Sequence, residues 1–147
     1  MEIRSRKSVT TIVSILALCG LCSCDALAPD FSDWEVRYPP SISLSVRSLE
    51  FTALVGGADP DSQIVHIKNV GGEPLTGLSA SVTYQIGQPT GWLSAELKST
   101  SAPTYMVVRA TAGALQADTL SAAIFVSSSV DGVWRKSLPV SLVLSSP

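Results

Sequence analysis

Cysteine and histidine are scarce in this chain. All three cysteines, Cys19, Cys22 and Cys24, lie within the first 24 of 147 residues, and His66 is the single histidine. The chain after Cys24 therefore has no thiol for a disulfide, a nucleophile or a zinc site, and no second imidazole for a metal cluster. With more than 100 residues remaining, it can still fold around a packed core without such cross-links.

The chain also has little charge and few of the short motifs that mark catalysis. Its 10 basic and 12 acidic residues give a formal net charge of -2, so there is no basic surface to attract nucleic acid. The sequence has no phosphate-binding loop, no Gly-x-Ser-x-Gly elbow and no paired-carboxylate motif. We therefore predict neither an enzyme nor a bound cofactor, and no nucleic-acid partner.

The first 23 residues have the pattern of an export signal. Arg4, Arg6 and Lys7 precede a mostly apolar run at residues 9–21. This order of a charged and an apolar region is typical of a secretory signal peptide. A membrane-spanning helix needs about 20 apolar residues, more than this run contains. We predict a signal-peptide helix over residues 1–23 that is removed from the mature protein.

The end of this segment resembles the lipobox of bacterial lipoproteins. Leu21 stands three positions before Cys24, and the small residue Ser23 stands directly before it. The resemblance implies that Cys24 is lipidated and becomes the mature N-terminus. It also implies a membrane-anchored lipoprotein of the bacterial cell envelope, on the periplasmic or the cell-surface side. The alternative is an ordinary signal peptide that is cut near Ala26 or Ala28.

Residues 24–40 contain the lipidated cysteine and an expected tether. They show neither helical nor strand periodicity, and prolines such as Pro39 and Pro40 favour extended backbone. Three aromatic residues, Phe31, Trp34 and Tyr38, are many for a free linker. Docking of these rings on the following domain, a place at the membrane interface and simple exposure all remain open.

From Ser41 the pattern changes to short runs in which apolar and polar residues alternate, separated by glycine, proline and aspartate. Alternation with a period of two is typical of strands with one buried face, and many short strands indicate an all-β sandwich. We predict seven to eight strands in one domain over residues 41–147. The predicted strands are residues 42–47 with 49–53, then 63–69, 78–86, 93–97, 105–111, 119–127 and 136–144.

The same alternation assigns each strand residue to a face. Residues expected to point into the core are Leu49, Phe51, Val65, Ile67, Leu78, Ala80, Val82, Tyr84, Ile86, Met106, Val108, Leu120, Ala122, Ile124, Val126, Leu138, Val140, Leu142 and Leu144. Apolar residues expected on the outside are Ile64, Tyr105, Val107, Phe125 and Val143. If the strand order makes these outer residues neighbours, they form a patch that suggests a protein partner.

Several stretches between residues 43 and 144 carry a family resemblance. Among them are Asn69-Val70-Gly71-Gly72, Gly91-Trp92-Leu93 and the closing Leu138-Pro139-Val140-Ser141-Leu142. Their order resembles the BACON-like group of immunoglobulin-like β-sandwiches. That resemblance implies a non-enzymatic module of bacterial surface or secreted proteins, some of which are thought to bind glycans or mucin. The chain departs from the family at Asp118-Thr119-Leu120, where the family has Gly-Thr-Tyr.

Aromatic residues are the candidate ligand contacts, because a flat apolar ring can stack on a sugar. The candidates are Trp134, Tyr105 and Trp92. We expect Trp134 to be exposed, because it follows the Asp131-Gly132 turn. Trp92 opens a predicted strand, so a place in the core competes with a role in binding.

Acidic residues and the histidine are weaker candidates. Asp59 and Asp61 flank Pro60 and could supply oxygens to Ca²⁺, but such a site needs six to eight oxygen ligands, and turn formation explains the same residues. His66 is expected to face solvent without a catalytic partner. We predict no metal site.

Together these observations predict a lipid-anchored, non-enzymatic envelope module that docks a protein partner or serves as a structural or adhesive domain. A carbohydrate-binding module for glycan or mucin is the alternative, and an enzyme is a remote one.

Overall fold

The computed structural model describes residues 38–113 and 115–147. The predicted signal-peptide helix, the lipidation site Cys24 and tether residues 25–37 lie outside this part of the chain. Within the described part, no helix is long and apolar enough to cross a membrane.

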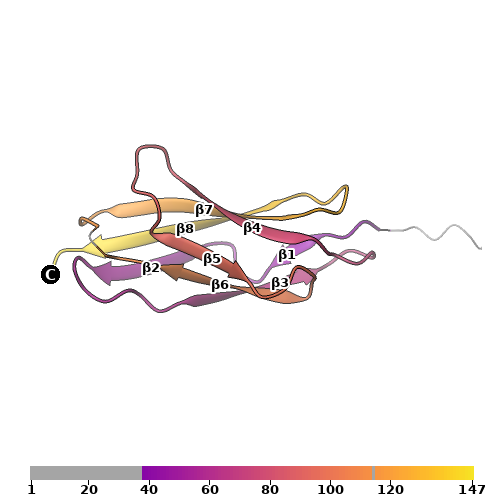
Figure 1. Cartoon of the computed structure of the whole chain (residues 1–147), viewed down its shortest axis with the longest axis horizontal. Helices are drawn as coiled ribbons and strands as arrows, with labels where there is room; N and C mark the ends of the chain where they lie inside the picture. Colours follow the sequence, from indigo (N-terminus) through magenta and orange to yellow (C-terminus); the bar gives the residue numbers. More distant parts are fainter. Residues whose placement is uncertain (1–37, 114) are drawn as a thin grey trace, which may run out of the picture. The chain divides into compact units, whose positions relative to one another are not determined.

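The described chain folds into eight strands, which confirms the all-β prediction (Figure 1). Their bounds are β1 (Ile42–Leu44), β2 (Leu49–Leu54), β3 (Gln63–Asn69), β4 (Leu78–Tyr84), β5 (Leu93–Leu97), β6 (Thr104–Ala110), β7 (Thr119–Ser128) and β8 (Lys136–Ser145). The six strands from β3 to β8 begin and end within two residues of the predicted positions.

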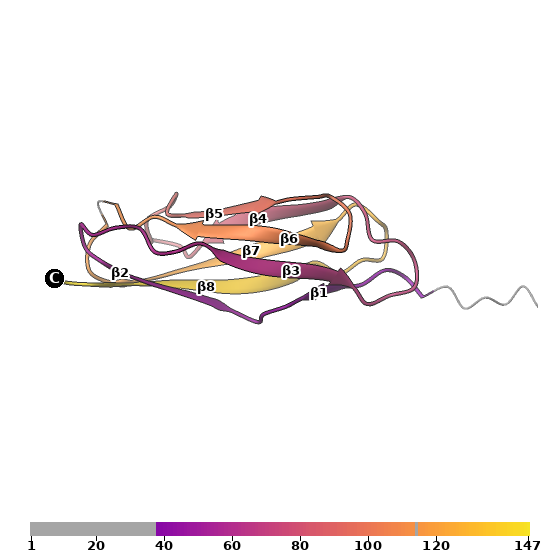
Figure 2. The same ribbon diagram turned by 90° about the horizontal axis from the view of Figure 1, so that it is seen from below.

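The strands form two four-stranded sheets that pack face to face (Figure 2). One sheet has the order β1-β3-β6-β5, and the other has the order β2-β8-β7-β4. The paired strands are antiparallel except β2 and β8, which run parallel. Sheet one corresponds to strands A, B, E and D of an immunoglobulin domain, and β4, β7 and β8 correspond to C, F and G. The chain is therefore an immunoglobulin-like β-sandwich, as predicted.

The first predicted run is divided between the two sheets. β1 pairs with β3, whereas β2 pairs with β8 on the opposite side of the core. At the crossing, Ser45 N donates a hydrogen bond to His66 O at 2.9 Å, so the chain leaves the first sheet just after this residue. The alternation shifts by one residue at the crossing, from Ile42 and Val46 to Leu49, so the sequence marks a break in the strand. It cannot reveal the change of sheet, because burial does not report which strand each half pairs with.

The core lies between the sheets and contains the residues that alternation assigned to it, with one exception. It also contains Ile42, Leu75, Trp92, Leu93, Ala110 and Ala112. Leu138, Leu142, Ile124, Val65 and their neighbours are buried in one continuous cluster. The exception is Ile86, which was predicted to point inward and is fully exposed. β4 ends at Tyr84, and the chain turns beyond it, where Gln88 N donates to Gln85 O. The prediction failed because the turn interrupts the alternation.

The loops gather at two ends of the sandwich. The described chain begins at the same end as the β3–β4 and β7–β8 loops, and the C-terminus lies at the other end with the β4–β5 loop (Figure 1, Figure 2). Ser129 N donates to Gly77 O, which joins the two loops of the first end. At the second end, Leu144 N donates to Asp118 O, and Gln85 N donates to Ser121 O. We call these the N-terminal end and the C-terminal end.

Residues 38–40, which we assigned to the tether, pack against the N-terminal end. Tyr38 O accepts hydrogen bonds from Gly72 N at 3.2 Å and Glu73 N at 3.1 Å, and Pro40 is buried. A Cβ at Gly71 would collide with the backbone oxygen of Pro39. Glycine is thus required at this position by close approach of two backbone segments.

Candidate functional site

The outer face of the β1-β3-β6-β5 sheet carries a group of apolar and aromatic side chains. On β3 and β6, Ile64 lies opposite Val107, and His66 lies opposite Tyr105. Ile64 is 55% exposed and Tyr105 is also exposed. We call these four residues the Tyr105 surface. Because β3 pairs with β6, these side chains are neighbours and form a small patch on the sheet. The sequence predicted such a patch for outward apolar residues on adjacent strands.

Val107 differs from its expected exposure. Alternation places it on the outer face, yet only 9% of its surface is exposed. It lies between Ile64 on β3 and Glu96 on β5, and these larger neighbours cover it. Val107 therefore acts as the floor of the Tyr105 surface rather than as a contact residue.

His66 is exposed, as predicted, but it has an aromatic neighbour. Its ring centroid lies 6.3 Å from that of Tyr105, and the planes are tilted by 57°. Its backbone N–H donates to Ser45 Oγ at 3.0 Å. The sequence could not reveal the ring pairing, because it depends on the register of β3 with β6.

A charged group borders this surface on β5 and β6. Glu96 accepts hydrogen bonds from Lys98 Nζ at 2.8 Å and from Arg109 Nη1 at 3.3 Å. The bond from Lys98, followed by that from Arg109, lowers the pKa of the Glu96 carboxyl below its usual value. All three side chains are about half exposed, so the pairs add little to stability but set the charge pattern of the rim.

The pKa of Glu96 is a measurable consequence. Both cations favour the ionised carboxylate, so their stabilising effect is present above the usual glutamate pKa and is lost as the pH falls through the lowered one. We expect Lys98→Ala to raise the Glu96 titration midpoint in a carboxyl NMR titration. Lys68→Ala, in a strand that does not border β5, should leave the midpoint unchanged. A midpoint that is insensitive to Lys98→Ala would contradict this assignment.

The other two outward apolar residues lie on the opposite sheet. Phe125 on β7 faces Ser137, whereas Val143 on β8 faces Thr119, so they are well separated along the strands. The Arg135 guanidinium lies 4.7 Å from the centre of the Phe125 ring, in a cation–π arrangement. The five outward apolar residues therefore do not form a single patch. Ile64, Tyr105 and Val107 lie on one sheet, and Phe125 and Val143 lie on the other.

Trp92 belongs to the core. It is 3% exposed, and its ring meets that of Tyr84 edge-on at 5.9 Å. Tyr84 Oη donates to Leu93 O at 3.0 Å, which holds the tyrosine in place. The Trp92 Nε1 atom is buried and has no hydrogen-bond partner. Trp92 thus offers no face to a ligand, in agreement with the competing core interpretation.

Trp134 has the opposite environment. It lies in the β7–β8 loop and is 86% exposed. In the described part of the chain, the aromatic pairs are His66 with Tyr105 and Tyr84 with Trp92, so no second ring faces Trp134. It can insert into an apolar or interfacial environment, but it does not form a two-ring platform for a sugar.

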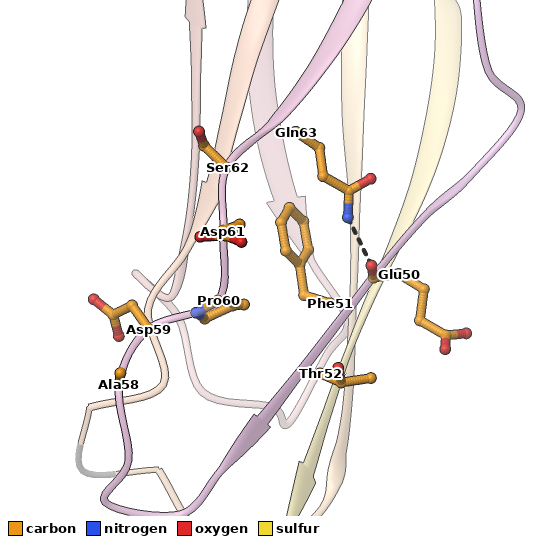
Figure 3. Close-up of a pocket in the computed structure, with 9 residues that line it drawn as sticks. All are labelled: Glu50, Phe51, Thr52, Ala58, Asp59, Pro60, Asp61, Ser62 and Gln63. Atoms are coloured by element: carbon orange, nitrogen blue, oxygen red, sulfur yellow. Dashed lines mark hydrogen bonds between the residues drawn. The ribbon is translucent and has the colours of Figure 1, made fainter.

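A shallow, open pocket lies beside β2 and the loop before β3, where the calcium alternative was placed (Figure 3). Asp59 Oδ1 accepts a hydrogen bond from Ala112 N at 2.8 Å, so it holds the loop to the chain just after β6. The carboxylates of Glu50 and Asp59 point away from each other in Figure 3. Within the described residues, no three histidine, cysteine or acidic side chains group as metal ligands would.

Comparisons with known proteins find partial structural likeness. No protein-family model and no curated protein sequence matches the chain. A Bacteroides ovatus GH5 xyloglucanase, solved in complex with a XXXG heptasaccharide, is 17% identical with a TM-score of 0.44, over 71% of this chain and 19% of that chain. An endo-fucoidan hydrolase of glycoside hydrolase family 107 is 12% identical with a TM-score of 0.46, and the match covers 78% of this chain and 14% of the hydrolase chain. The titin M3 domain is 12% identical with a TM-score of 0.40, and the match covers 74% of this chain and 98% of the titin domain. The chain thus spans less than a fifth of the two enzymes.

Proposed function

We propose that this chain is a non-enzymatic, lipid-anchored module of the bacterial cell envelope that docks a protein partner through the Tyr105 surface. The lipobox-like sequence ending at Cys24 supports the anchor and the location. The ordered stretches that resemble the BACON-like group support a place among the immunoglobulin-like modules of bacterial surface proteins.

The observation that carries the docking role is the composition of the Tyr105 surface. Exposed Ile64 and Tyr105 form its apolar centre, and Glu96, Lys98 and Arg109 form a charged rim along one side. Protein interfaces have this arrangement, with aromatic and aliphatic anchors in the middle and polar groups around them. A partner with an apolar residue at its centre and charges at its edge would match it.

The arrangement of polar groups supports a non-enzymatic role. His66 faces the Tyr105 ring, and the Ser45 hydroxyl beside it accepts the backbone N–H of His66. A serine nucleophile needs its hydroxyl hydrogen-bonded to the imidazole of a base, whereas the hydrogen bond between Ser45 and His66 is made by the histidine backbone. The carboxylates of Glu50 and Asp59 diverge, so they do not face a common substrate atom.

Site-specific photo-crosslinking in living cells tests the docking proposal. Benzoylphenylalanine in place of Tyr105 in the full-length protein is expected to form one discrete adduct. The matched control is the same residue in place of Ser81, which is exposed on the other sheet. Ile64→Asp should abolish the adduct at Tyr105, because it buries a charge in the apolar centre. Identical adducts from both positions, or no adduct at Tyr105, would contradict the proposal.

Carbohydrate binding is the second candidate, and the exposure of Trp134 is the observation in its favour. A sugar site usually needs polar groups around a stacking ring, and Arg135 beside Trp134 is already placed over Phe125. Reproducible binding of the wild-type protein to a glycan or mucin array, lost on Trp134→Ala, would put this candidate first.

A further inference from the structure

Exposed aromatic residues gather at the N-terminal end of the sandwich. Trp134 lies in the β7–β8 loop, and Tyr38 begins the described chain; both are largely exposed. Val70, directly after β3, is also exposed, and its backbone N–H donates to Ser41 O. Three chain segments therefore present apolar or amphipathic side chains at one end of the domain, separate from the Tyr105 surface.

The charges are distributed unevenly between the two ends. At the N-terminal end, Lys68, Arg135 and Lys136 accompany the acidic residues Glu73 and Asp131. At the C-terminal end, the loops between β2 and β3, β4 and β5, and β6 and β7 contain three aspartates and no lysine or arginine. The domain is thus most negative at its C-terminal end. An anionic surface would attract the N-terminal end and repel the C-terminal one.

The length of the tether limits how far the same end can lie from the predicted anchor. Thirteen residues, 25–37, separate the predicted lipidated Cys24 from Tyr38. A segment of this length spans at most about 45 Å when fully extended, and about 20 Å on average as a flexible chain. The described chain begins at the N-terminal end, which also holds the β7–β8 loop with Trp134, so this is the end that the tether joins to the predicted anchor (Figure 1, Figure 2).

We propose that the N-terminal end is a membrane-contact site, at which Trp134 and Tyr38 insert at the level of anionic phospholipid headgroups. Tryptophan and tyrosine favour this interface because their rings are apolar and their N–H or O–H groups bind water. Lys136 follows two positions after Trp134 and meets the lipid phosphates, whereas Arg135 stays over the Phe125 ring. The site rests on the proposed lipid anchor. It holds the sandwich upright, so that the Tyr105 surface faces sideways and stays accessible.

Tryptophan quenching by brominated lipids tests this site. The full mature lipoprotein, with Trp34→Phe to remove the tether indole, is reconstituted in vesicles of phosphatidylethanolamine and phosphatidylglycerol with brominated acyl chains. We expect bromine to quench the emission of Trp134 but not that of Trp92, which is 3% exposed. Trp134→Phe should abolish the quenching. Vesicles of phosphatidylcholine alone should give weaker quenching, because they carry no net negative charge.

The matched control moves the reporter to the opposite end. Ile86 is fully exposed in the β4–β5 loop, so Ile86→Trp in the Trp134→Phe background should show no quenching. Equal quenching at both positions, or equal quenching on both lipid compositions, would overturn the proposed site. A fatty-acid label on Cys24 is measured in the same samples. Labelled protein without Trp134 quenching overturns the contact site alone, whereas absence of the label overturns the anchor and the site with it.

Discussion

Trp92→Ala is expected to lower the free energy of unfolding by about 3 to 5 kcal/mol, the usual cost of removing a large aromatic side chain from a core. Trp92 is 3% exposed and belongs to the continuous cluster between the sheets. Its loss leaves a cavity beside Tyr84, whose ring meets it edge-on. Urea denaturation followed by far-ultraviolet circular dichroism measures the change.

Two variants make this prediction specific. Trp134→Ala removes the same side chain from a site that is 86% exposed, so it should change the free energy of unfolding by no more than about 0.5 kcal/mol. Trp92→Phe keeps an aromatic ring and removes an N–H that has no acceptor, so it should cost less than Trp92→Ala. Similar losses of unfolding free energy for Trp92→Ala and Trp134→Ala would contradict the prediction that the buried tryptophan contributes more to stability than the exposed one.

Cys24→Ser is expected to remove the lipid from the protein completely. Lipidation requires the cysteine thiol, and no cysteine follows Cys24 in the sequence. Cells grown with an alkyne fatty acid should incorporate the label into the wild-type protein but not into the variant. The variant should also leave the membrane fraction or accumulate uncut, because stable anchoring depends on the acyl chains.

Cys22→Ser is the matched control for the anchor. Cys22 lies at a position where the lipobox tolerates variation, so this variant should keep the label and stay in the membrane fraction. Label that persists in Cys24→Ser would exclude this lipidation site. An unlabelled wild-type protein would favour an ordinary signal peptide cut near Ala26 or Ala28.

The two surfaces would give an anchored molecule separate tasks. The Tyr105 surface lies on the outer face of one sheet, formed by β3 and β6. Trp134 lies in the β7–β8 loop and Tyr38 begins the described chain, and both the loop and this start of the chain are at the N-terminal end. Because the residues do not overlap, Ile64→Asp should impair partner docking without changing lipid contact, and Trp134→Phe should do the reverse.

Strand positions and buried faces followed from local patterns. In β7, Leu120, Ala122, Ile124 and Val126 alternate with more accessible residues, as the sequence predicted. This agreement is expected because a strand between core and solvent imposes a period of two on its own sequence. The prediction failed where the chain left the strand, as at Ile86, since a turn ends the alternation within one residue.

The sequence by itself determined that this chain is a sandwich of short strands, which side chains form most of its core, and that Trp134 follows an exposed turn. Only the tertiary structure decided which outer residues are neighbours. It brought Ile64, His66 and Tyr105 together on one face and placed Phe125 and Val143 on the other. It also divided β1 and β2 between the sheets. The reason is physical: alternation records burial within a strand, whereas strand order and register depend on pairing between segments that are distant in the chain.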